Sequence, residues 1–228
     1  MNGRPILKVV TPAATYALTS LIHARAEVGL TDDSNDMRLG RLIKGASSTI
    51  SAFCNRVFGV ETVTETFRAD TAGYRMVVPG VSPGLPRNEH PLLLSRPNVI
   101  SVGSLLESGN ALVQDTDFEV DTRSGIIYRL SSGLRYAWLA PLVVLTYTSG
   151  FKLPQDAASV SGPPLPDTVE DACLALVRAA WFAGGRDPSV AVDALNGDRT
   201  SFWDRSVGTM TLDEGLQLQL TPFRVFFG

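Results

Sequence analysis

The stretch from Leu142 to Ala183 changes abruptly from a strand pattern to a helix pattern, and this change constrains the fold most strongly. Leu142–Thr148 is apolar and rich in β-branched residues, which is typical of a buried strand. After the linker 155–166, the segment Asp167–Ala183 is rich in Ala and Leu and begins with acidic residues, as an amphipathic helix does. A second such helix is predicted far upstream, and most residues between the two have strand patterning. Helices from both parts of the chain must therefore close around a β-rich insert.

The upstream helix is predicted over Asp36–Phe58, with Gly59 as its end. Its apolar residues recur at spacings of four and three, which predicts a seam that packs against other helices. The seam consists of Leu39, Ile43, Ala46, Ile50, Phe53 and Val57. A shorter helix is predicted before it, over Pro12–Val28, with one apolar side formed by Leu18, Leu21, Ile22 and Val28. The segment Leu212–Gly228 fits a strand or a helix equally well.

Between the two major helices the period of the pattern changes to two. At Glu61–Phe67, threonines alternate with Val63, Glu65 and Phe67, which predicts a strand. Further strands are predicted at Tyr74–Val78, Leu92–Ser95, Val99–Glu107, Asp117–Asp121, Gly125–Leu130 and Leu142–Thr148. Short strands with frequent turns predict an antiparallel meander or a small sandwich.

The sequence thus predicts an α+β fold, in which a helical bundle from the N-terminal and C-terminal helices carries an antiparallel β-rich insert. We expect one composite domain with three parts: helical residues 1–59, the insert 60–150, and the C-terminal helix and tail 151–228. A hydrophobic content of 44% with 19% charged residues is typical of a globular protein. The longest apolar run, Ala137–Tyr147, is too short to cross a membrane. The first residues carry no apolar signal segment, so we expect synthesis in a cytoplasm.

Candidate metal and redox residues are few. The two cysteines, Cys54 and Cys173, lie one on each major helix and are expected to be reduced core residues, with a disulfide between the helices as the alternative. An acidic row resembles the start of a calcium loop: Asp115, Asp117, Glu119 and Asp121. It lacks the glycine and the closing glutamate that such a loop needs, so we interpret it as the solvent face of an edge strand. No metal or cofactor is expected.

The chain has two histidines, His23 and His90. Either could in principle serve a Ser–His–Asp triad, but no Gly-x-Ser-x-Gly turn or comparable nucleophile turn is present. A hydrolase that uses His90 remains an alternative, whereas a loop residue is the simpler interpretation. We therefore expect no catalytic residues and no enzyme activity.

The charges favour protein contacts over nucleic-acid binding. The net charge is −3, the wrong sign for a protein that holds phosphates. Seventeen arginines stand against three lysines, and arginine is favoured at protein interfaces, although coding bias explains the ratio equally well. Arg38, Arg41 and Lys44 share one helical face, which is either a solvated face or a docking stripe for an acidic neighbour. Three aromatic residues near the C-terminus, Phe223, Phe226 and Phe227, pack on the chain's own core or on a partner.

The order of these motifs resembles that of the head–tail connector (adaptor) proteins of long-tailed bacteriophages and related gene transfer agents. The resemblance covers residues 30–224 and is carried by the segments 36–43, 52–58, 61–67, 92–102, 117–121, 125–130 and 143–154, the helix at Asp167, and the terminal Leu-Thr-Pro-Phe-Arg224. The first thirty residues and the stretch 187–211 depart from the family pattern.

The resemblance implies a structural protein of the virion. Members of the family form a ring, typically of twelve copies, beneath the portal at the capsid vertex. The ring extends a channel through which double-stranded DNA passes without specific binding, and it meets a downstream stopper or tail-completion protein. By this analogy the C-terminal segment, with Phe223, Arg224, Phe226 and Phe227, is a candidate for portal contact. The rival to this interpretation is a β-rich tail or receptor-binding module, which would expose aromatic residues such as Trp138 or Trp203.

Overall fold

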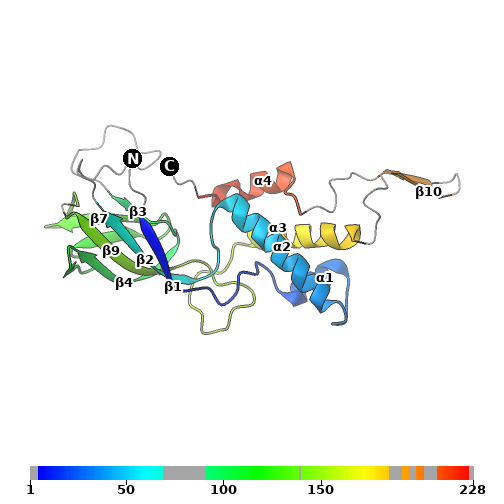
Figure 1. Ribbon diagram of the computed structural model, residues 1–228, viewed down its shortest axis with the longest axis horizontal. Coiled ribbons are helices and arrows are strands. Elements are labelled where there is room, and N and C mark those ends of the chain that lie inside the picture. The colour runs from blue at the N-terminus through cyan, green and yellow to red at the C-terminus, as the bar shows by residue number, and fades with distance from the viewer. Residues whose placement is uncertain are drawn as a thin grey trace.

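The protein is elongated, with a β-rich part at one end and a helical part at the other (Figure 1). The computed structural model describes residues 5–68, 91–138, 140–184, 192–195, 199–202 and 210–225. Its helices are α1 (Leu21–Val28), α2 (Asp36–Cys54), α3 (Asp167–Ala183), α4 (Glu214–Leu220) and a 3-10 turn (Thr221–Phe223). Its strands are β1 (Ile6–Thr11), β2 (Glu61–Arg68), β3 (Leu92–Leu93), β4 (Val99–Glu107), β5 (Asn110–Ala111), β6 (Phe118–Asp121), β7 (Ile126–Ser131), β8 (Leu134–Tyr136), β9 (Leu142–Ser149), β10 (Val192–Leu195) and β11 (Arg199–Phe202). The predicted α+β class is confirmed.

Two antiparallel sheets form the β-rich part. The larger has the strand order β1-β2-β9-β4-β5, and the smaller has the order β3-β7-β6, with β8 paired to β7. Strands β10 and β11 pair with each other. Side chains from both sheets share one core, among them Val63 and Leu145 from the larger sheet and Phe118 and Ile127 from the smaller. Of the two predicted arrangements, an antiparallel meander or a small sandwich, two antiparallel sheets around one core match the sandwich. The predicted strand Tyr74–Val78 lies outside the described residues.

Strand β1 was not predicted, and it corrects the prediction that residues 1–59 are helical. It pairs antiparallel with β2, from Ile6 opposite Thr66 to Thr11 opposite Thr62, with an irregularity after Val9. Most of its side chains are exposed, because it lies at the sheet edge. A strand of this kind has no alternating burial pattern, so periodicity does not detect it.

The predicted helix Pro12–Val28 is wrong over its first half. Helix α1 begins at Leu21, because the hydroxyl of Ser20 accepts a hydrogen bond from the His23 N–H at 3.1 Å and so caps the helix there. Leu18 lies in the irregular segment before α1, and its side chain is buried. The Leu18 N–H donates a hydrogen bond to Ser47 Oγ at 3.0 Å. Ile22, predicted to face the core, is 73% exposed.

Helix α2 carries the predicted seam as far as Phe53, but it ends four residues earlier than predicted, so Val57 lies beyond it. Leu39, Ile43, Ala46 and Ile50 are buried, as the spacing predicts. The helix ends at Cys54 because Asn55 adopts a left-handed conformation, with φ of 50°, and turns its N–H back to the carbonyl of Ala52. Gly59 therefore does not end the helix.

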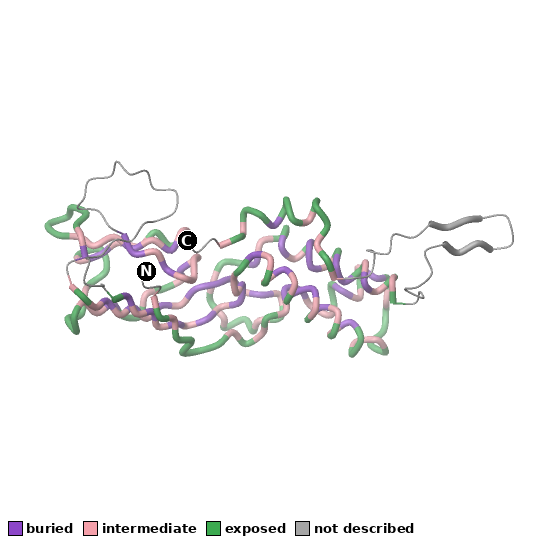
Figure 2. Tube along the Cα trace, turned by 45° about the horizontal axis from the view of Figure 1, so that its top comes forward, coloured by how far each residue is buried: buried purple, intermediate pink, exposed green. Residues whose placement is uncertain are grey.

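Helices α1, α2 and α3 contact one another and enclose a second core (Figure 2). Helix α3 matches its predicted bounds, Asp167–Ala183. The ambiguous segment Leu212–Gly228 contains helix α4, which Asp213 caps by accepting from the Leu216 N–H at 2.7 Å. Leu220 of α4 is buried in the helical core.

Both cysteines are buried in the helical core and unbonded, as predicted. Cys173 Sγ lies 3.6 Å from Ser47 Oγ, and Cys54 Sγ lies 3.8 Å from the Leu220 carbonyl. Burial raises the pKa of each thiol to about 11. Neither side chain is therefore present as a reactive thiolate at neutral pH.

We expect the native protein to react with a thiol reagent such as 5,5′-dithiobis(2-nitrobenzoate) only when it unfolds. Burial both excludes the reagent and suppresses the thiolate. Absorbance should show two thiols released in guanidinium chloride and almost none in buffer at pH 8. Rapid modification of the folded protein would contradict the buried positions of Cys54 and Cys173.

The two cores meet at a close backbone junction. Residues Gly59 and Phe151 form an isolated parallel bridge, and the Phe151 N–H donates to the Phe58 carbonyl at 2.7 Å. The rings of Phe58 and Phe151 stack with centroids 6.3 Å apart. Because both rings belong to the helical core, the strands β2 and β9 are fixed directly to the helices.

Candidate interaction surfaces and the buried polar cluster

The three basic residues of the predicted docking stripe are all exposed on α2. They lie on the side of the helix away from the buried seam, as the helical spacing predicts. Arg41 Nη2 lies 3.8 Å from Met37 Sδ on the preceding turn. Within the described residues, neither Arg41 nor Lys44 forms an ion pair. The role of the stripe in binding a partner stays a prediction.

Arg38 differs from the other two because it packs on its own chain. Its guanidinium lies 4.2 Å from the ring centroid of Trp181, and its Nη2 donates to the Trp181 carbonyl at 3.1 Å. This carbonyl lies in the last turn of α3, where a positive charge is favourable. Arg38 thus links the start of α2 to the end of α3.

A groove of about 420 Å³ lies beside the exposed face of α3. Its lining is mostly apolar, with Phe182 52% exposed. We call it the α1–α3 groove, and it is lined by Glu27, Asp171, Leu174, Ala175, Arg178, Ala179 and Phe182. Arg178 Nη1 pairs with Glu27 Oε1 at 3.2 Å across the two helices. Asp171 has no ion-pair partner within the described part of the chain.

The C-terminal segment is anchored to the end of α2. Phe223 packs against the helical core, and the guanidinium of Arg224 lies 4.8 Å from the ring centroid of Phe53. The Val225 N–H donates to the Cys54 carbonyl at 2.9 Å, and Asn55 Nδ2 donates to the Val225 carbonyl at 3.2 Å. Phe226 and Phe227 lie outside the described residues. Of the three C-terminal aromatic residues, Phe223 thus packs partly against the core of its own chain.

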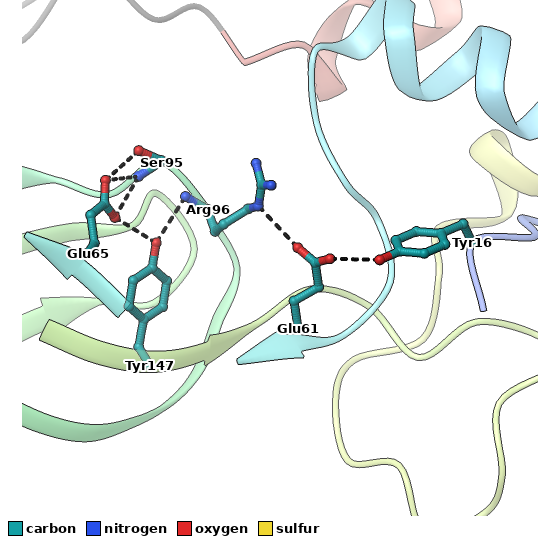
Figure 3. Close-up of polar contacts among 6 residues, drawn as sticks. All are labelled: Tyr16, Glu61, Glu65, Ser95, Arg96 and Tyr147. Atoms are coloured by element: carbon teal, nitrogen blue, oxygen red, sulfur yellow. Dashed lines mark hydrogen bonds and ion pairs between the residues drawn. The ribbon is translucent and has the colours of Figure 1, made fainter. Parts of the chain in front are cut away.

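A buried polar cluster joins the larger sheet to the segment between β3 and β4 (Figure 3). Glu65 on β2 is 0% exposed, and its carboxylate accepts hydrogen bonds from the N–H and hydroxyl of Ser95 and from Tyr147 Oη, the last at 2.8 Å. Tyr147 Oη in turn accepts from the Arg96 N–H at 3.1 Å. Burial raises the pKa of Glu65, and the donated hydrogen bonds and the charge of Arg96 oppose that rise.

Glu61, two residues before Val63, lies on the same buried side of β2 and continues the cluster toward the helices. Its carboxylate lies 3.4 Å from Arg96 Nε and accepts from Tyr16 Oη at 3.1 Å. Tyr16 belongs to the irregular segment before α1 (Figure 3). The period-two pattern at 61–67 predicted the strand but did not reveal that its buried side carries two glutamates. The missed signal is that Glu61 and Glu65 share a face with Val63 and Phe67.

Arg56 is a largely buried cation that lacks a carboxylate partner among the described residues. Its guanidinium lies 5.0 Å from the Phe58 ring centroid and 5.3 Å from that of Phe151. Its Nε is buried without a hydrogen-bond acceptor. Burial lowers the pKa of Arg56 to about 10, so the residue stays charged at neutral pH.

Replacing Arg56 with methionine is expected to keep or raise the free energy of unfolding, by up to about 1 kcal/mol. Methionine retains the contact with both rings and removes the cost of a buried, unpaired charge. Arg56→Ala is the matched comparison, and it should lose about 1–2 kcal/mol because the packing is lost as well. Urea unfolding measures both. A methionine variant as unstable as the alanine variant would show that the charge itself stabilises the fold.

Of the two histidines, the structure describes only His23. His23 Nδ1 lies 2.6 Å from Glu170 Oε1, which also accepts from Thr19 Oγ1, and this pair links α1 to α3 at the surface. His90, on which the hydrolase alternative depends, lies outside the described residues. Trp138 is 2% exposed within the β core, so it does not provide the exposed aromatic of a receptor-binding module. Trp203 lies outside the described residues.

The acidic row has local structural partners. Asp117 accepts from the Val113 N–H, and Asp121 accepts from the N–H groups of Arg123 and Ser124. Glu119 pairs with Arg135 at 2.6 Å. Within the described ranges, no three His, Cys, Asp or Glu side chains are placed to hold a metal ion. None of the described helices is long and apolar enough to cross a membrane.

Comparison with known proteins gives a match at the level of structure. No family model and no curated protein matches the chain. A chain from the neck of an empty GTA particle matches with a TM-score of 0.54 and 14% identity, over 98% of this chain and 97% of that one. Chains from the neck of a native GTA particle and from the virion of a native gene transfer agent (GTA) particle match with TM-scores of 0.53, at 15% and 14% identity and the same coverage. The chain therefore shares the fold of chains found in gene transfer agent particles.

Proposed function

We propose that this protein is a structural head–tail connector of a tailed phage or a related particle. The observation that carries the proposal is the fold match to neck chains over 98% of this chain, which leaves little of either protein unaccounted for. The order of motifs in the sequence supports it independently. On this proposal the protein is a virion component at the portal vertex, made in the host cytoplasm, and not an enzyme.

The proposed assembly is a ring beneath the portal that extends the DNA channel. The matching neck structures were computed with C6 and C12 symmetry, which supports a ring whose copy number is a multiple of six, with twelve as the expectation. One heterologous contact, repeated around an axis, generates such a ring. A net charge of −3 suits a channel that lets DNA pass, because a strongly positive lining would retain phosphates.

The proposed partners are a portal protein on one side and a stopper or tail-completion protein on the other. The segment with Phe223 and Arg224 supports a portal contact because Arg224 is exposed and the segment lies beside the C-terminal end of α2. We also propose that the chain is one composite domain with three parts, which are residues 1–59, 60–150 and 151–228. Strand β1 of the first part is a member of the larger sheet, which supports treating the first part and the insert as one domain.

Deletion of the gene in a particle-producing strain tests the proposal. A missing connector should leave DNA-packaged heads and free tails that do not join, and expression of the wild-type chain should restore joined particles. Electron microscopy distinguishes the products. Joined particles that lack only host binding would contradict a connector and would instead favour a receptor-binding module.

A further inference from the structure

We propose that the outward face of α2 in one copy docks onto the α1–α3 groove of the next copy. The inference rests on the proposed ring and names the contact that would close it. The docking face consists of Met37, Arg41, Lys44 and Ser48, which lie on one side of α2 and are all exposed. The receiving surface is the α1–α3 groove as defined above.

The receiving surface combines apolar walls with an unbalanced negative charge. Phe182 is 52% exposed, and Leu174, Ala175 and Ala179 extend its apolar surface along α3. Glu27 and Arg178 neutralise each other, so Asp171 is left as the charge without a partner in the described groove. A fitting partner therefore presents an apolar side chain beside a positive charge.

The docking face has this composition. Met37 is 74% exposed, the largest exposed fraction among the exposed large hydrophobic side chains of the described residues. Arg41 lies against it at 3.8 Å, and Lys44 follows on the next turn. Two cations that have no carboxylate partner among the described residues thus follow one exposed methionine along α2, and this combination complements the apolar and acidic groove. A groove of about 420 Å³ has room for the methionine side chain.

The contact must join different copies, because α2 and α3 pack against each other through their buried sides. Each copy then carries one docking face and one groove, and the two surfaces are unlike. A contact between unlike surfaces is heterologous and closes into a ring when its rotation allows. Arg38 does not belong to the docking face, because it is held by Trp181.

Zero-length cross-linking in a mixture of ¹⁴N- and ¹⁵N-labelled chains tests the contact. A carbodiimide joins a lysine amine to a carboxylate only when the two groups touch, and the chain has only three lysines: Lys8, Lys44 and Lys152. We expect mixed-isotope peptides that join Lys44 to Asp171, identified by mass spectrometry. Asp171→Asn should abolish this product. Glu119→Gln, a matched neutralisation in the β-rich part, should leave it unchanged.

Charge exchange provides the second arm. Asp171→Lys, and separately the pair Arg41→Glu with Lys44→Glu, should each reduce inter-chain association at least tenfold, as measured by sedimentation of the concentrated protein. Combining all three substitutions in one chain should restore association. Circular dichroism confirms that the exposed substitutions leave the fold intact. Recovery in the triple variant cannot arise from misfolding.

Three results would overturn the proposal: Lys44 products confined to one chain, inter-chain Lys44 products with carboxylates outside the groove, or no inter-chain Lys44 product at all. None of them bears on whether the protein lies in the neck, which the gene deletion tests in particles. Conversely, a Lys44–Asp171 product between chains would support the contact even if the protein were absent from the neck. Absence from the neck would contradict the connector function alone.

Discussion

Replacing Glu65 with alanine is expected to lower the free energy of unfolding by about 3–5 kcal/mol. The side chain is fully buried and accepts hydrogen bonds from Ser95 and Tyr147, so its removal leaves buried donors without an acceptor and a cavity beside them. Tyr147 cannot turn its hydroxyl elsewhere at no cost, because the Arg96 N–H already donates to it. Urea unfolding followed by tryptophan fluorescence measures the loss.

The matched control is Glu119→Ala. Glu119 is half-exposed and paired with Arg135 on the surface of the smaller sheet, so its loss should cost less than about 1 kcal/mol. The comparison separates burial from charge, because both variants remove one glutamate from the β-rich part. Equal losses from the two variants would contradict a stabilising buried cluster.

The effect of Glu65→Ala should also depend on pH. Burial raises the pKa of Glu65 above the usual glutamate value of 4.5, so its stabilising contribution is complete below that value and declines as the pH rises through the folded-state pKa. The difference in unfolding free energy between wild type and Glu65→Ala should therefore be larger at pH 4 than at pH 8. When Glu65 is protonated, its carboxyl O–H can donate a hydrogen bond to the Ser95 hydroxyl. That hydroxyl then accepts from Glu65 instead of donating to it. A difference that grows with pH would show that the donors outweigh burial.

Replacing Gly150 with alanine is expected to cost about 3 kcal/mol or more. Gly150 has a φ of 125°, which residues with a side chain rarely adopt. A Cβ at this position would overlap the backbone of Gly59. The site lies beside the bridge between Gly59 and Phe151, so relief of the overlap would separate the sheet from the helical core. Thermal unfolding monitored by circular dichroism should show a large fall in the melting temperature.

Gly109→Ala is the control for this substitution. Gly109 also has a positive φ, of 87°, but nothing lies within 4 Å of a Cβ built there. In this variant the free energy of unfolding should fall by only about 1 kcal/mol, which is the cost of a positive φ for alanine. A similar loss at both positions would mean that the close junction at Gly150 contributes nothing.

The sequence predicted the elements whose burial repeats regularly. The α2 seam and the α3 helix follow the helical period, and β2 follows the period of two, because one face of each is buried. Strand β9 was predicted from its apolar, β-branched composition. Strand β1 escaped because it is an exposed edge strand whose stability comes from pairing with β2. The N-terminus of α1 was misplaced because Ser20, and not the apolar pattern, decides where the helix begins.

The candidate surfaces were predictable only in part. The exposed face of α2 follows from helical geometry, so Arg41 and Lys44 could be placed on it from sequence alone. The α1–α3 groove depends on how two helices distant in sequence pack, as does the contact of Arg38 with Trp181. The buried glutamates were read as ordinary members of an alternating strand, because their donors Ser95, Tyr147 and Tyr16 come from three other segments.

Electron cryomicroscopy of the neck in particles that contain this protein shows directly whether it is a connector. The connector function requires a ring of this chain, with the sandwich and the helical core both recognisable, directly beneath the portal and coaxial with the DNA channel. Finding the chain at the tail tip, on the capsid surface, or nowhere in the mature particle would contradict it.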